Sequence, residues 1–177
     1  MTSETPDALR RDLEEHHAAS FGWALSCCGR DRTEAEDVLQ IAYLRVLSGE
    51  ARFEGRSSLK TWLFGVIRQV AREQRRKRLL RWLGIGRASA EPTTTKPALP
   101  ASPEQSAEQA EDARAVIAGL STLSDRQREV LHLVFYADLT VREAAAVMNV
   151  SAGTAALHYE RGKKALASHL AKRGIVR

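Results

Sequence analysis

Residues 138–166, DLTVREAAAVMNVSAGTAALHYERGKKAL, decide the fold of the C-terminal part of the chain because they contain two helix starts. Thr140 followed by Glu143 has the pattern of a capping box, and apolar residues then recur at helical spacing as far as Met148. After a short turn, Ser151 is expected to cap a second helix. Two short helices joined by a tight turn indicate a helix-turn-helix.

The second of these helices has two different faces. Its inward stripe is predicted to contain Ala155, Tyr159, Gly162 and Leu166. The outward face is the one that such a helix presents to a DNA major groove. With one cation from the preceding helix, the candidate duplex-binding residues are Arg142, Thr154, Ala156, Leu157, His158, Arg161 and Lys164. A helical hairpin that binds nothing has the same pattern, so the motif alone leaves both interpretations open.

Charged residues are unevenly distributed along the chain. Residues 1–50 hold 5 basic and 10 acidic side chains, whereas residues 51–87 hold 11 basic and 2 acidic. Residues 88–120 are net acidic, and residues 121–177 are net basic again. Two basic zones separated by an acidic spacer predict contact with a polyanion at two places, although each zone could also be a solvated face.

Composition also divides the chain into domains. Residues 88–107 contain four prolines and almost nothing to bury, which is typical of a linker. We therefore expect an all-helical protein with two small lobes, residues 1–87 and 108–177. Since no apolar run is long enough to span a membrane and the N-terminus lacks a signal-peptide core, we expect a cytoplasmic protein without direct membrane insertion.

The N-terminal lobe is predicted to contain three helices. The first would end at Gly29 and bury one face, made of Leu9, Leu13, Phe21, Leu25 and Cys28. The second would begin at Thr33, which makes another capping-box pattern with Glu36. The third would follow a cap at Ser57 or Ser58.

The second helix is predicted to have a mixed outer face. Its core residues would be Val38, Leu39, Ala42, Tyr43 and Val46. Its outer strip would contain Asp37, Gln40, Ile41, Leu44 and Arg45. An exposed Ile beside an exposed Leu favours a protein-binding face, unless the helical register is shifted by one residue.

The third helix combines an apolar stripe with a basic face. The stripe contains Leu59, Trp62, Leu63, Val66, Ile67 and Val70, and Trp62 is expected in the core. The other face contains Lys60, Arg68, Gln69, Arg72, Arg75 and Arg76, and these residues together with neighbouring Thr61 are the candidate DNA-binding residues. Lys77, Arg78 and Arg81 extend this charge. Lys and Arg would neutralise phosphates, Gln69 and Arg72 could reach base edges, and Lys60 and Thr61 could flank a pocket for an unstacked base.

No pattern predicts catalysis or a bound cofactor. The chain lacks a spaced set of metal ligands, a glycine-rich phosphate loop and a nucleophile with a nearby base. Cys27 and Cys28 are adjacent on a predicted helix, where their side chains diverge. A redox or metal role with His16 and His17 is conceivable, but small buried apolar positions are the favoured interpretation.

Three segments together resemble one known family. They are AEDVLQIAYLRVL at 35–47, SSLKTWLFGVIRQVA at 57–71 followed by arginines, and LSTLSDRQREVLHLVFYADLTVREAAAVMNVSAGTAALHYERGKKAL at 120–166. Over about residues 10–80 and 104–170 the chain is similar to the extracytoplasmic-function (ECF) group of bacterial sigma factors, which implies that its lobes correspond to regions 2 and 4.

The resemblance implies a role for each predicted surface. Helix 33–48 would dock on core RNA polymerase through Asp37, Gln40 and Leu44, with Ile41 beside them. Residues 57–78 would engage and melt the minus-10 element, and the helix from Ser151 would read the minus-35 element. Such proteins are not enzymes, need no cofactor and are commonly held by an anti-sigma factor.

Several positions depart from the family pattern. Ile41 stands where an acidic residue is common, Gly65 where a basic or polar one is common, and Gln69 where Asn is frequent. Ala156 and His158 occupy positions often held by Lys and Arg, so the promoter sequence cannot be copied from relatives, and minus-35 affinity would depend on His158, Arg161, Lys163 and Lys164.

The segment LLRWLGIG, residues 79–86, is unusually apolar. It would either extend the lobe as a packed helix or bind an inhibitor protein, for which the apolar anchors would be Ile41, Leu44, Trp82, Leu83 and Ile85. The alternative for the whole chain is a helix-turn-helix regulator of the response-regulator output type. Regulators of that class have a segment similar to LSDRQREVL, but membership of the class would not account for the segment SSLKTWL and the basic helix that contains it.

Overall fold

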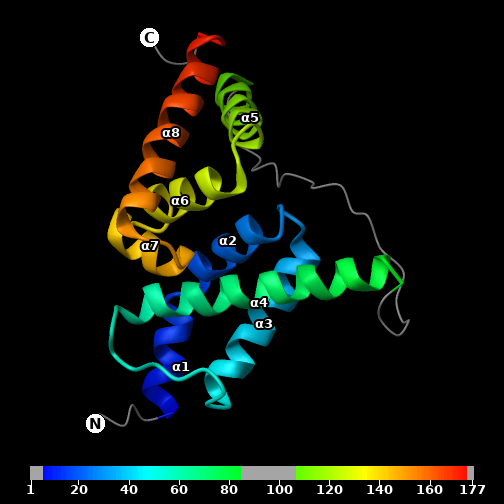
Figure 1. The fold of residues 1–177 in the computed structure, drawn as a ribbon, viewed down its shortest axis with the longest axis vertical. Helices are drawn as coiled ribbons and strands as arrows, with labels where there is room; N and C mark the ends of the chain where they lie inside the picture. Colours follow the sequence, from blue (N-terminus) through cyan, green and yellow to red (C-terminus); the bar gives the residue numbers. More distant parts are fainter. Residues whose placement is uncertain (1–5, 85–106, 175–177) are drawn as a thin grey trace. The chain divides into compact units, whose positions relative to one another are not determined.

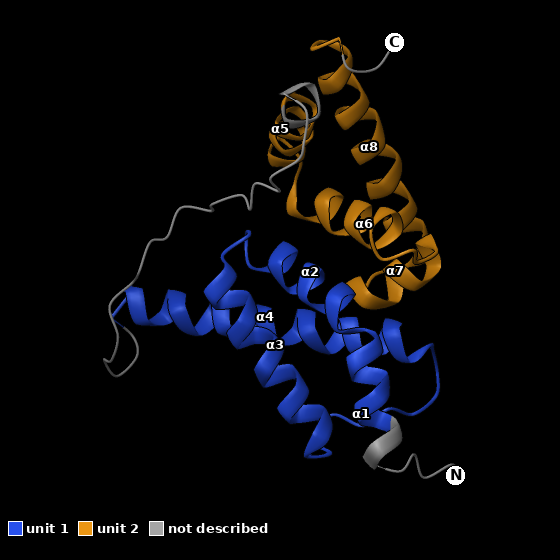
Figure 2. Cartoon of the chain, turned by 180° about the vertical axis from the view of Figure 1, so that it is seen from behind, with its two compact units in different colours: residues 1–97 blue, residues 98–177 orange. Residues whose placement is uncertain are grey.

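The computed structural model describes residues 6–84 and 107–174. Within these ranges the chain forms eight α-helices and no strand, so the predicted all-helical fold is confirmed. The chain divides into two compact units, residues 1–97 and 98–177 (Figure 2). Apart from Ala107, the predicted linker 88–107 lies outside the described residues.

Unit 1 contains four helices (Figure 1). They are α1 (Pro6–Glu15), α2 (His17–Cys27), α3 (Arg32–Leu47) and α4 (Leu59–Trp82). Helices α2, α3 and α4 all pack against one another, while α1 contacts α2 and α3. The core of the unit therefore lies among α2, α3 and the first half of α4.

A tryptophan ties two of these helices together. Trp23 of α2 and Phe64 of α4 are fully buried, and their rings stack with centroids 6.0 Å apart. The indole Nε1 donates a hydrogen bond to the carbonyl oxygen of Phe64 at 3.0 Å. Because a buried indole normally needs a partner for its N–H, this bond fixes how Trp23 sits in the core.

The predicted first helix is wrong in one respect, because it is two helices. The chain bends at His16, whose φ of −91° and ψ of 3° lie in the bridge region of backbone conformations. The bend resets the buried face, so that α2 buries Ser20, Trp23 and Ala24. Of the predicted stripe only Leu13 is fully buried, and Phe21, Leu25 and Cys28 are half-buried.

The predicted start of α3 is also wrong. Asp31 is the N-cap, and its carboxylate accepts a hydrogen bond from the backbone N–H of Glu34 at 3.0 Å. Asp is itself a preferred N-cap residue, so the cap lies two residues before the predicted one at Thr33 and the helix begins at Arg32. Glu36 pairs with Arg32 at 2.9 Å. The buried face is as predicted at Val38, Leu39, Ala42 and Val46, while Tyr43 is half-buried.

Helix α4 is long and changes its environment half-way along. Ser58 caps it by accepting from the backbone N–H of Thr61, which settles the choice between the two predicted serines. No described residue after Ala71 in this helix is buried. Two ion pairs hold the second half on α3: Arg45–Glu73 at 2.6 Å and Arg78–Glu34 at 2.7 Å.

Unit 2 contains the other four helices. They are α5 (Ala107–Ser121), α6 (Asp125–Phe135), α7 (Val141–Met148) and α8 (Ala152–Ala171). Helix α8 contacts all three others. A glycine permits its close approach to α6, because a Cβ atom on Gly162 would lie 3.2 Å from Leu131 Cδ1 and 3.3 Å from Gln127 Cβ.

The predicted helix-turn-helix is confirmed. Thr140 and Glu143 form the capping box of α7, and Ser151 caps α8 by accepting from the backbone N–H of Thr154. Asn149 ends α7 with a φ of 53°, a left-handed conformation that asparagine tolerates better than most residues. Of the inward stripe of α8, Ala155 and Gly162 are buried, whereas Tyr159 and Leu166 are half-buried.

Candidate nucleic-acid and protein interfaces

The outer strip of α3 is exposed nearly as predicted. Asp37, Gln40 and Leu44 are exposed, and Ile41 is half-buried. Two hollows border this strip. The smaller one, of about 220 Å³, lies between α3 and α4 and is lined by Glu34, Asp37, Val38, Gln40, Ile41 and Gln74.

The larger hollow lies between α2 and α3, and we call it the α2–α3 groove. It has a volume of about 440 Å³ and is lined by His17, Phe21, Arg32, Glu36, Leu39, Gln40, Tyr43, Leu44 and Leu47. Its floor is mainly apolar, while Arg32 and Glu36 form an ion pair at its edge. Such a groove suits the apolar face of an amphipathic helix.

Sequence reasoning identified only part of this groove. The sequence pattern predicts Phe21 in the core, and it makes no prediction for Leu47, which is exposed. The signal that could have found the groove is the spacing of Leu44 and Leu47, which adds a second apolar turn to one side of α3.

The basic face of α4 is smaller than the sequence predicted. Gln69, Arg72, Arg75 and Arg76 are exposed and Lys60 is half-buried. However, Arg68 is only 5% exposed, so the prediction that it lies on the exposed face is wrong. Thr61, the candidate beside a base pocket, is only 3% exposed. Arg68 lies on the same side as Phe64 and Ala71, because the core-facing side of this helix is wider than one apolar stripe.

Thr61 was expected to flank a pocket for an unstacked base together with Lys60, but its side chain is buried. The hydroxyl of Thr61 accepts a hydrogen bond from Ser58 Oγ at 2.8 Å, within the helix cap. Trp62 is half-buried and packs on Phe53, with ring centroids 5.4 Å apart, so it is not a core residue as predicted. The backbone cap and this aromatic pair occupy the start of α4.

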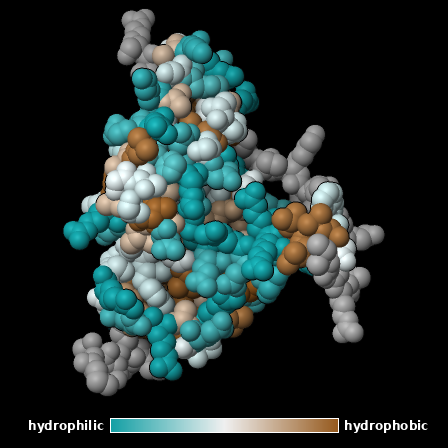
Figure 3. Space-filling view, viewed as in Figure 1, coloured by the Kyte–Doolittle hydropathy of each residue, from teal (hydrophilic) through white to brown (hydrophobic). Residues whose placement is uncertain are grey.

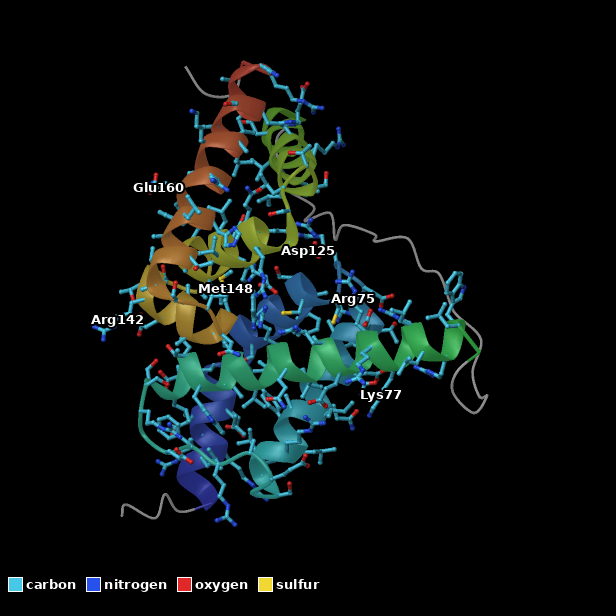
Figure 4. All side chains as sticks on the ribbon, in the orientation of Figure 1. Arg75, Lys77, Asp125, Arg142, Met148 and Glu160 are labelled. Carbon is cyan, nitrogen blue, oxygen red and sulfur yellow. The ribbon has the colours of Figure 1, made fainter. Side chains whose placement is uncertain are left out.

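Ion pairs neutralise the carboxylates nearest the basic face. Glu73, the only acidic residue of α4, accepts from Arg45 Nη2 at 2.6 Å and from Gln69 Nε2 at 3.1 Å. The hydrogen bond from Arg45 holds the pKa of Glu73 below its ordinary value. Arg78 makes two hydrogen bonds to Glu34, at 2.7 and 2.8 Å. The exposed cations of the face are shown with their neighbours in Figure 4, where Arg75 and Lys77 are labelled.

The outer face of α8 mixes two exposed cations with uncharged side chains. Thr154, Leu157, Arg161 and Lys164 are exposed, and Ala156 and His158 are half-buried. The hydroxyls of Thr154 and Ser151 are hydrogen-bonded at 2.8 Å. Arg142 of α7 is exposed and extends outward from its helix (Figure 4).

Lys163 is engaged within its own helix. Its Nζ pairs with Glu160 at 2.9 Å and lies 4.5 Å from the centre of the Tyr159 ring. The hydrogen bond to Glu160 raises the pKa of Lys163. The ion pair partly offsets the positive charge that this lysine was expected to contribute to the face.

The two cysteines do not form a reactive pair. Cys27 and Cys28 are half-buried and form no disulfide, and burial is the main cause that raises the pKa of Cys28 to about 12. Within the described ranges no group of His, Cys, Asp and Glu side chains is arranged to hold a metal ion. None of the helices described is long and apolar enough to cross a membrane.

Two family models match the chain, one in each unit. Sigma-70 region 2 matches residues 13–80, and Sigma-70, region 4 matches residues 119–166. The ECF RNA polymerase sigma factor SigX of Bacillus subtilis is 33% identical over 144 residues, which are 80% of this chain and 73% of the relative. The chain belongs to the ECF sigma factors of the sigma-70 family.

Other sigma factors are similar over most of the chain. The ECF RNA polymerase sigma factor EcfG of Rhodopseudomonas palustris is 30% identical over 164 residues, covering 93% of this chain and 86% of the relative. A structure of the sigma factor RpoE with the anti-sigma factor NepR, from Bartonella quintana, has a TM-score of 0.69 and 25% identity, covering 92% of this chain and 96% of that one.

A second structure supports the same fold. CnrH, solved with the cytosolic domain of CnrY, has a TM-score of 0.64 and 21% identity, covering 96% of this chain and 92% of that one. The match of region 2 to unit 1 sets aside the response-regulator alternative, which has no account of that unit. As a sigma factor the chain acts in transcription initiation by binding RNA polymerase and DNA, and it is not an enzyme.

Proposed function

We propose that this sigma factor directs promoter-specific initiation through three surfaces: the α3 strip, the basic face of α4 and the outer face of α8. The observation that carries the proposal is that the two family matches contain all three surfaces. The proposal assigns residues 1–87 and 108–177 to two functional domains, joined by a linker at 88–107, in a cytoplasmic protein.

The α3 strip is the proposed contact with core RNA polymerase. Asp37 and Gln40 offer polar groups, while Leu44 and half-buried Ile41 offer apolar contacts. The hollows on both sides of the strip can receive side chains of a partner. An apolar centre with polar neighbours is the usual composition of a protein interface.

The basic face of α4 is the proposed contact with the minus-10 element. Thr61 and Arg68 are excluded from it by their burial, which leaves Lys60, Gln69, Arg72, Arg75 and Arg76. Lys60 and the arginines would neutralise phosphates. Since Gln69 already donates to Glu73, its amide is held in one orientation, from which its oxygen can accept from a base.

The outer face of α8 is the proposed reader of the minus-35 element. Arg142, Arg161 and Lys164 would contact phosphates, while Thr154, Leu157 and His158 lie where the first turns of a recognition helix meet base edges. Ala156 contributes only a methyl group, which suits an apolar contact with a thymine methyl.

We further propose that an anti-sigma factor controls this protein by covering the α2–α3 groove. The RpoE structure was solved with such a partner, NepR. The groove is concave and mainly apolar and includes Leu44 of the α3 strip. A partner helix in the groove would therefore compete with polymerase for Leu44.

The test uses the full chain and purified core RNA polymerase. Leu44→Asp should weaken polymerase binding by about tenfold or more, since burying a leucine contributes about 1.5–3 kcal/mol. Leu79→Asp is the matched control, because Leu79 is 54% exposed and Leu44 is 59% exposed. Run-off transcription from candidate promoters measures initiation.

Three outcomes decide the assignment. A chain that does not bind core polymerase, but binds duplex DNA tightly as a free dimer, would overturn the proposal. Equal losses in the two variants would remove the polymerase contact from α3. A cellular inhibitor that binds simultaneously with polymerase would overturn the proposed competition in the groove.

A further inference from the structure

The end of α4 carries three exposed apolar side chains. Leu79 is 54% exposed, Trp82 77% and Leu83 51%, so these three do not pack on their own lobe as one interpretation of the sequence expected. Their spacing of three and four residues places them on one face of the helix. Figure 3 shows this apolar patch at the free end of α4. We call the three side chains, with the adjacent cations Arg75, Arg76, Lys77 and Arg81, the α4 tip.

The charges that α4 itself carries beside the patch have one sign. All four cations of the α4 tip are exposed, and no acidic residue occurs between Gln74 and Gly84. The nearest carboxylate on the helix, Glu73, is already paired with Arg45 at 2.6 Å. The α4 tip is thus a short amphipathic segment in which cations surround a tryptophan and two leucines.

These features favour one kind of partner. DNA phosphates would account for the cations, but contact with phosphates does not bury two leucines. An inhibitor helix is better accommodated by the concave α2–α3 groove than by a projecting helix end. A basic segment with Trp and Leu on one face is the composition of helices that lie at anionic membrane surfaces, where Trp sits at the level of the headgroups.

We propose that the α4 tip binds the surface of bilayers containing anionic phospholipids. The contact is peripheral: Trp82, Leu79 and Leu83 enter the interface between headgroups and acyl chains, and the arginines and Lys77 attract the negative headgroups. A shallow contact of this kind does not cross the bilayer, so it is compatible with the expectation from sequence that the protein does not insert into a membrane.

The location of the α4 tip has a consequence for regulation, which rests on the proposed function. Arg75 and Arg76 belong both to the α4 tip and to the proposed minus-10 surface. Membrane and promoter DNA would therefore exclude each other, and the membrane-bound fraction of the protein would be inactive.

The test mixes the full chain with vesicles of phosphatidylcholine alone or of phosphatidylcholine and phosphatidylglycerol in equal parts. Co-sedimentation is expected only with the anionic vesicles, and salt at about 1 M should abolish it because the screening length is then about 3 Å. Trp82 should report binding by a blue shift in its fluorescence, since Trp23 is fully buried and Trp62 half-buried.

Matched variants distinguish binding by the α4 tip from non-specific adsorption of exposed apolar side chains. Trp82→Ala combined with Leu83→Ser should reduce vesicle binding by about tenfold or more. Phe135→Ala combined with Tyr136→Ser removes two similarly exposed aromatic rings from unit 2 and should bind as the wild type does. Circular dichroism confirms that each variant is folded.

The proposal is overturned if anionic vesicles do not bind the wild type, if neutral vesicles bind it equally well, or if the unit 2 variant loses as much binding. Quenching of Trp82 by promoter DNA without any vesicle binding would make the tip a nucleic-acid surface instead. Run-off transcription by the same protein without vesicles keeps the two proposals distinguishable. A chain that binds anionic vesicles but does not initiate transcription in their absence refutes only the proposed function.

Discussion

Removing two cations from the basic face of α4 should change how promoter binding depends on salt. Arg72 and Arg76 are exposed, and replacing both with alanine should alter the free energy of unfolding by no more than about 0.5 kcal/mol each. Each phosphate contact contributes about 0.7 (single strand) to 0.9 (duplex) to the slope of log K against log salt. Two lost contacts should therefore lower the slope by about 1.4–1.8.

This slope can be converted into a measurable difference in affinity. Between about 50 and 200 mM salt, the wild-type complex of sigma factor, core polymerase and promoter should lose about 7- to 12-fold more affinity than the complex of the double variant. Fluorescence anisotropy of labelled promoter DNA measures the affinity at each salt concentration, and permanganate footprinting measures promoter opening.

A matched variant controls for net charge. Arg10→Ala with Arg114→Ala removes the same charge from exposed positions on α1 and α5. Because charges separated by more than about 10 Å are screened at 0.1 M salt, this control should keep the wild-type slope. If the Arg72 and Arg76 variant keeps the slope and opens promoters normally at 200 mM, the second half of α4 is a solvated basic face and our assignment is refuted.

Three further predictions concern the fold and its titratable groups. Arg45 lowers the pKa of Glu73, so the charged carboxylate stabilises the folded state above the ordinary glutamate pKa of about 4.3. In urea titrations the stability difference between wild type and Glu73→Gln should shrink below that pH and disappear only once the pH has fallen through the lowered pKa of Glu73 in the folded state. Gly162→Val should destabilise the folded protein by about 1–3 kcal/mol, because a Cβ atom at this position would lie 3.2 Å from Leu131. Gly22→Ala should stabilise it by about 0.5–1 kcal/mol, because nothing lies within 4 Å of the added Cβ atom. Calorimetry that gives the same sign for both changes would contradict this prediction. Since burial raises the pKa of Cys28 to about 12, iodoacetamide at pH 8 should label it only in denaturant, and rapid labelling of the folded protein, seen by mass spectrometry, would show that the thiol is accessible and ionised.

The predictions from sequence were most accurate where one local interaction decides the structure. The caps at Thr140 and Ser151 are correct because a short side chain satisfies the nearest backbone N–H groups whatever surrounds the helix. The same rule gave the wrong residue at α3, since Asp31 and Thr33 are both good caps and only one can begin the helix. Neither proline nor glycine occurs at the bend at His16, so the sequence contains no helix-breaking signal there, and the pattern predicted one helix where there are two.

The errors at the candidate sites have a different origin. The pattern predicts Arg68 on the surface because charged residues usually lie there, but α4 is packed by α2 and α3 together, and its buried side is wider than one apolar stripe and includes Thr61 and Arg68. Burial on two sides depends on tertiary packing, which periodicity does not contain. The pattern of a single helix could not predict the α2–α3 groove for the same reason, because side chains of two different helices line it.

The two proposed DNA surfaces differ in their charge, and this difference predicts that they contribute differently to promoter binding. From Gln69 to Arg81, α4 exposes six cations, of which Arg78 is already bound to Glu34. On the outer face of α8 the exposed cations are Arg161 and Lys164, while neighbouring Lys163 is paired with Glu160. Phosphate contacts give affinity that depends on salt, whereas base contacts give discrimination. Most of the salt-dependent affinity should therefore come from unit 1, and the choice among minus-35 sequences from the uncharged side chains of α8.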